Sequence, residues 1–82
     1  MINYDILPEH MRGGMKRYIE SKVPPGGFLM AVLENNLIEA VGRADRINRE
    51  RLFDFCNFLY NKAPSRCWGS PEKVKTWLGE DK

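Results

Sequence analysis

The chain has few of the residues on which catalysis and metal binding depend. Its 82 residues include one histidine and two cysteines. His10 has no nucleophile beside it in the sequence, and its neighbour Glu9 would point about 100° away on a helix. Cys56 and Cys67 lack the close spacing of cysteines in a structural zinc site. We therefore expect a protein that is not an enzyme and that holds no metal and no cofactor.

An excess of charge of one sign and a long apolar run are also missing. The net charge is only +2, whereas a dedicated nucleic-acid binder concentrates more positive charge on one face. No apolar run approaches the ~20 residues that span a bilayer, and residues 1–5 have neither the basic nor the apolar part of a secretory signal. These absences predict a cytoplasmic protein with free thiols and no membrane partner.

The chain does contain enough apolar material for one small core. Hydrophobic residues make up 43% of it, with four Phe, three Tyr and two Trp. This composition argues against disorder, and the length fits one domain. We expect a single helical domain over residues 1–82, with a lead-in at 1–6 and a tail at 80–82 that both fray.

One long helix, residues 46–62, is predicted as the centre of this domain. Asp45 can cap its start, and Pro64 cannot continue it. Phe53 and Tyr60 widen its apolar arc, so we expect it to meet more than one neighbour. The core-facing residues recur three and four positions apart: Leu52, Phe55, Cys56, Leu59 and Ala63.

Caps and helix breakers predict four more helices, at residues 8–21, 27–34, 36–44 and 71–78. The apolar run 28–33 also fits a buried strand, but Leu, Met and Ala favour a helix and no partner strand is evident. Gly13, Gly14 and Gly42 lie inside expected helices, which indicates close helix–helix contact. The predicted fold class is all-α, a compact bundle of about five short helices around 46–62.

Four arginines around the start of the central helix are the first candidates for partner binding. They are Arg43, Arg46, Arg49 and Arg51. The planar arginine fork suits both carboxylates and phosphates. Acidic residues are interleaved with the arginines, so a solvated face with pairs such as Arg46–Glu50 is the alternative.

Two aromatic residues are the other candidates. Phe58 lies opposite the main apolar face of the central helix, so we expect it in a second packing surface or in an interface. Trp68 follows Cys67 in a loop. It could anchor a partner, or it could cover the core beneath the last helix and pair with Trp77.

Several segments resemble a family of small proteins encoded by tailed phages and prophages. The similarity spans about residues 7–78 and is carried by Pro8–Gly14, Arg17–Glu20, Pro24–Gly26, Phe28–Leu29, Ala31–Leu33, Phe58–Asn61, Ala63–Pro64 and Cys67–Pro71. The resemblance implies a setting, the bacterial cytoplasm during infection or lysogeny. It brings no shared activity and no functional residue.

Two functions from different classes follow from these observations. The first is a non-enzymatic phage accessory protein that binds and inhibits a host protein, such as a bacterial defence complex, as anti-CRISPR proteins do. The second is a nucleic-acid-binding regulator in which helices between 36 and 62 act as a helix-turn-helix. A homodimer is compatible with either function.

Overall fold

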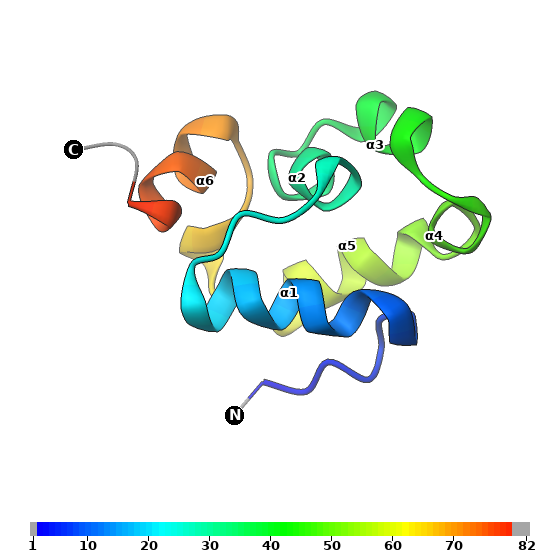
Figure 1. Cartoon of the computed structure of the whole chain (residues 1–82), viewed down its shortest axis with the longest axis horizontal. Helices are drawn as coiled ribbons and strands as arrows, with labels where there is room; N and C mark the ends of the chain where they lie inside the picture. Colours follow the sequence, from blue (N-terminus) through cyan, green and yellow to red (C-terminus); the bar gives the residue numbers. More distant parts are fainter. Residues whose placement is uncertain (1, 80–82) are drawn as a thin grey trace.

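The computed structural model of the chain describes residues 2–79, and this part is helical with no strand (Figure 1). It confirms the predicted all-α fold. The elements are α1 (Glu9–Ser21), α2 (Gly27–Leu33), α3 (Leu37–Arg43), α4 (Arg46–Glu50), α5 (Leu52–Asn61), a 3-10 turn η1 (Ser65–Cys67) and α6 (Pro71–Leu78).

The ambiguous apolar run is the helix α2, and its burial explains the missing periodicity. Five of its seven residues are buried, because α2 packs against α3, against α5 through Phe28 and against α1 through Leu29 (Figure 1). The ring of Phe28 meets that of Phe55 edge-on, with 5.0 Å between centroids. A helix buried on all sides shows no polar stripe in the sequence.

A single apolar core joins the helices. The largest side chains with no exposed surface are those of Tyr18, Phe55, Phe58, Leu7, Met15 and Leu33. Burying an apolar side chain of this size contributes roughly 1.5–3 kcal/mol each before entropy is counted. The hydroxyl of Tyr18 donates to the Cys67 carbonyl at 2.6 Å, which ties α1 to η1 inside the core.

The prediction of one continuous central helix over residues 46–62 is wrong in one respect, because the helix is interrupted at Arg51. The backbone of Arg51 has φ −111° and ψ 20°, and α4 ends before it while α5 begins after it. The cap at the start is as expected, since Asp45 accepts from the Asn48 N–H at 2.7 Å, and α5 ends at Asn61, before Pro64. The interruption turns Arg51 towards the N-terminal segment.

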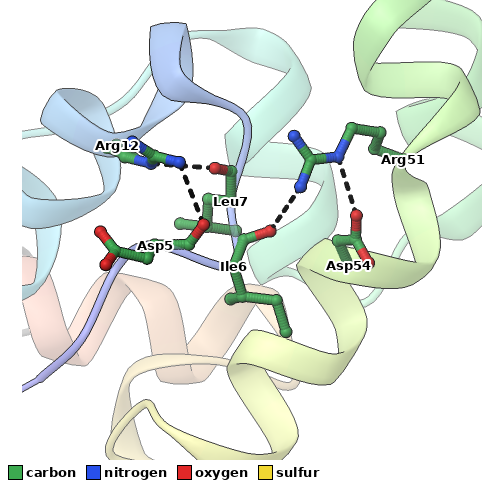
Figure 2. Close-up of polar contacts among 6 residues, drawn as sticks. All are labelled: Asp5, Ile6, Leu7, Arg12, Arg51 and Asp54. Carbon is green, nitrogen blue, oxygen red and sulfur yellow. Dashed lines mark hydrogen bonds and ion pairs between the residues drawn. The ribbon is translucent and has the colours of Figure 1, made fainter.

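Residues 2–7 are fastened to the helices instead of fraying. Figure 2 shows Arg51 donating to the Ile6 carbonyl at 2.8 Å and to Asp54 at 2.8 Å. Arg12 donates to the Leu7 and Asp5 carbonyls, each at 3.0 Å (Figure 2). Two guanidinium groups therefore satisfy the backbone of a segment that has no secondary structure of its own. The expected fraying at 80–82 lies outside the described residues.

Of the three glycines expected at close helix–helix contacts, only Gly14 lies against another helix. A Cβ on Gly14 would meet Leu29 of α2 at 3.6 Å, an ordinary packing contact. A Cβ on Gly13 would meet only the guanidinium of Arg17, on the same helix. A Cβ on Gly42 would have no neighbour within 4 Å, so the close contact expected there is wrong.

Candidate functional site

The sequence-predicted residues lie in three different places. Arg43 is the last residue of α3, with its side chain beside Gly27 of α2, and Arg46 and Arg49 lie on α4. Phe58 is fully buried, and its ring centroid lies 5.4 Å from that of Tyr4. Phe58 therefore belongs to a second packing surface inside the protein and cannot contact a partner. Arg51 holds the N-terminal segment. Trp68 lies in a different part of the structure, against α5.

The first candidate surface is the α3–α4 corner, which we define by Ile38, Val41, Arg43, Arg46, Ile47 and Arg49. Asn36 caps α3 by accepting from the Glu39 N–H at 3.3 Å, and Asp45 caps α4. Because only Ala44 and Asp45 connect the two helices, they lie at the same end of the molecule (Figure 1).

Aliphatic side chains of the α3–α4 corner face solvent. Ile38 is 81% exposed, Ile47 is 51% exposed and Val41 is 39% exposed. The sequence analysis did not identify Ile38 as a surface residue and assigned Val41 to the apolar side of its helix, while a small domain has too little core to cover every apolar residue. Exposed aliphatic groups in a cluster indicate a contact surface more strongly than single ones do.

The arginines of the corner differ in how they are paired. Arg43 pairs with Glu39, and Arg46 contacts Glu50 at 3.4 Å as the sequence predicted. The Arg46 side chain is nevertheless 87% exposed, so this pair is solvated and weak. Within residues 2–79, Arg49 takes part in no ion pair.

A histidine–carboxylate contact supports the corner from α1. The His10 Nε2 lies 3.1 Å from Asp45 Oδ2. The hydrogen bond from the Asn48 N–H holds the pKa of Asp45 below its ordinary value, and the His10 contact lowers it further. Sequence reasoning linked His10 only to Glu9, because nothing in the sequence relates positions that are 35 residues apart.

The second candidate surface is the α5 furrow, an apolar groove of about 410 Å³ beside α5. It is lined by Val32, Asn35, Phe53, Cys56, Asn57, Leu59, Tyr60, Asn61 and Trp68. A smaller hollow shares Val32, Asn35 and Cys56 with it and extends the groove to Leu37. Trp68 is half-buried and forms one wall.

The α5 furrow overturns two expectations. Cys56 is exposed in it and is not a core residue, while Cys67 of the predicted loop is fully buried. Phe53 and Tyr60 were expected to meet a second neighbour, but they are 76% and 80% exposed. Among residues 2–79 Trp68 forms no ring pair with Trp77, whose indole N–H instead donates to the Tyr18 carbonyl at 3.1 Å.

Neither surface has the features of a metal site or a membrane span. No group of three or more His, Cys, Asp or Glu side chains in the described residues could hold a metal ion. In that same part of the chain, no helix has the length and apolar character needed to cross a membrane.

No protein-family model, curated protein or solved structure matches the chain.

Proposed function

We propose that the chain is a non-enzymatic accessory protein of phages or prophages that binds a host protein in the bacterial cytoplasm and inhibits it. A bacterial defence complex is the target class we favour. The observation that carries the proposal is the α3–α4 corner, where two short consecutive helices carry both exposed aliphatic side chains and exposed arginines. Arginine around an apolar centre is the composition typical of protein interfaces.

The chemistry of the corner defines the partner. Ile38 and Ile47 supply apolar surface that gains free energy when it leaves water, about 25 cal/mol per Å². Arg46 and Arg49 extend beside them and attract an acidic surface, which raises the association rate. The partner is therefore a protein with an apolar hollow surrounded by Asp or Glu. The partner is inhibited if that hollow is part of its active site or of the site where it binds its own ligand.

The test begins with affinity capture from a bacterial lysate and continues with purified components. Binding of the captured protein is measured for the unmodified chain, for Ile38→Asp and for the double variant Arg46→Glu with Arg49→Glu. We expect Ile38→Asp to weaken the affinity at least about tenfold, because it places a charge at the centre of the contact. The arginine variant should lower the association rate most strongly at low salt.

Lys75→Glu on α6 is the matched control, because it reverses one exposed charge away from the corner. We expect it to bind as the unmodified chain does. A captured protein that binds both corner variants with unchanged affinity would refute the assignment of the corner. A captured protein whose activity is unaffected when bound would refute inhibition but not binding.

A further inference from the structure

The α5 furrow is notable for the charges that it lacks. Charged residues make up 29% of the chain, yet none lines the furrow or its extension towards Leu37. Its polar side chains are neutral amides together with Cys56, Tyr60 and Trp68, and Asn61 donates to the Asn57 carbonyl at 3.1 Å. A partner that fills this groove therefore brings an apolar surface without charge at its centre.

The outward side of α5 has the spacing of a helix–helix seam. Phe53, Cys56, Asn57 and Tyr60 follow one another at three, one and three positions, which places them within about one quarter to one third of the helix circumference. The core residues Phe55 and Phe58 lie on the other side, while the buried Leu59 reaches the inner wall of the furrow. The midpoint of the stripe falls between Cys56 and Asn57, so the stripe looks alike when read from either end.

We propose that a second copy of this chain fills the furrow, with α5 packed antiparallel against α5 of that copy. The two-fold axis passes beside Cys56 and Asn57. Phe53 of each chain then lies across from Tyr60 of the second copy. The outcome is a closed dimer in which both furrows are covered at once.

The absence of charge favours a second copy over another partner. In a two-fold interface each residue near the axis meets its own counterpart, so a charge there would face a like charge. Cys56 and Asn57 avoid this repulsion. The antiparallel arrangement also places the positive end of one helix dipole beside the negative end of the other.

The surface area that the two chains can bury indicates how stable the dimer is. Burying two phenylalanine and two tyrosine rings removes roughly 600 Å² from water, at about 150 Å² for each ring. A stable interface needs about 1,200 Å² in total, and Leu37, Cys56 and Trp68 of both chains supply more surface. The dimer therefore falls at the small end of specific interfaces, and we expect it to dissociate on dilution.

This inference is independent of the α3–α4 corner, because the two surfaces share no residue. Phe53→Asp should abolish the dimer while a single chain keeps its affinity for the host protein. Ile38→Asp should do the reverse. The two variants thus serve as controls for each other, and the failure of one proposal is distinguishable from the failure of the other.

Sedimentation over a range of protein concentrations is the first test. The unmodified chain should reach twice its mass of 9.5 kDa as concentration rises, whereas Phe53→Asp should remain at the single-chain mass. Far-ultraviolet circular dichroism shows whether Phe53→Asp is folded, which we expect because Phe53 is 76% exposed. A single-chain mass for the unmodified protein at every concentration would overturn the proposal.

Cross-linking at Cys56 tests the orientation of the helices. Near the two-fold axis of packed helices, Cys56 approaches its counterpart to about the Cα separation that a disulfide spans, ~4.4–6.8 Å. Diamide, which takes up the two hydrogen atoms lost by the thiols, should therefore link two chains, and Cys56→Ser should prevent this. A dimer that persists in Phe53→Asp, or that leaves Cys56 unlinked, would place the contact elsewhere and overturn the proposal.

Discussion

At the scale of single residues, Arg51 shows how one guanidinium connects three parts of the chain. It lies between α4 and α5 and donates both to Asp54 and to the Ile6 carbonyl (Figure 2). We expect Arg51→Ala to lower the free energy of unfolding by about 1–2 kcal/mol, because the Ile6 carbonyl and Asp54 lose a charged donor in a half-exposed setting. Urea denaturation measures this change.

Arg46→Ala is the matched control for Arg51, because it removes an arginine that pairs with a carboxylate in solvent. We expect a change within about 0.5 kcal/mol. Equal losses in the two variants would mean that the bond to the Ile6 carbonyl contributes nothing to stability.

The two thiols should differ sharply in reactivity. Cys56 is exposed, whereas Cys67 is fully buried and its burial raises the pKa of its thiol to about 11. Because the thiolate is the reactive form, we expect a maleimide to label one cysteine per folded chain when the protein is dilute enough for the dimer to dissociate, and two cysteines in urea. Mass spectrometry should locate the first label on Cys56. Labelling of Cys67 at a similar rate in the folded protein would contradict the packing described for η1.

Asp45 should make stability depend on pH in the acidic range. Its pKa is lowered from the ordinary value of 3.8, so the unfolded chain takes up a proton before the folded chain does. The ionised carboxylate therefore adds to the free energy of unfolding above the unfolded-state pKa of 3.8. This stabilisation is lost as the pH falls through the lower pKa of the folded state.

The variant Asp45→Asn tests this dependence, because asparagine keeps a capping oxygen but has no carboxylate to titrate. We expect the melting temperature of the unmodified chain to fall more steeply below about pH 4 than that of Asp45→Asn. Thermal unfolding followed by circular dichroism between pH 6 and pH 2 measures both curves. Parallel curves would show that Asp45 titrates as it does in the unfolded chain.

At the scale of elements, Gly42 weakens α3 without a packing reason. A Cβ there would meet nothing within 4 Å, and its φ is not in the left-handed region. We therefore expect Gly42→Ala to raise the free energy of unfolding by about 0.5 kcal/mol. Gly69→Ala should lower it, because Gly69 has φ +125°. Urea denaturation of both variants measures the contrast.

The sequence allowed the helices to be predicted where a cap or a breaker marks an end. The helix predicted at residues 71–78 is α6, with Ser70 as its cap, Pro71 as its first residue and Gly79 just after its end. The interruption at Arg51 had no such signal, and the Ile6 carbonyl to which Arg51 donates is 45 residues away in the sequence. Periodicity also assigned Cys56 to the core, since a helical wheel does not show how far the neighbouring α2 reaches.

At the scale of the whole molecule, the surfaces favour a protein partner over nucleic acid. The net charge is +2, Arg43 and Arg46 have acidic partners, and α4 has five residues, which is short for a helix that enters a groove of DNA. We expect fluorescence anisotropy to show no saturable binding of duplex DNA at low salt. Tight binding that weakens steeply with added salt would instead support the helix-turn-helix hypothesis.

The candidate surfaces were harder to predict than the fold for a physical reason. Arg43, Arg46 and Arg49 could be grouped from the sequence because they lie within one short stretch. Whether an apolar residue such as Phe53 is covered depends on the size of the whole core, which no local pattern contains. Of the two alternatives for Phe58, the structure shows packing, since Phe58 is fully buried, whereas Phe53, which was expected to meet a second helix, is exposed.

The two tryptophans give this protein a pair of built-in optical reporters. Trp77 lies under the Lys22 ammonium, 3.5 Å from the ring centroid, so its emission follows the docking of α6 on α1. Trp68 forms a wall of the furrow, so its emission should shift to shorter wavelength when water leaves that groove. A chain carrying Trp77→Phe would thus report occupancy of the furrow alone, without any attached dye.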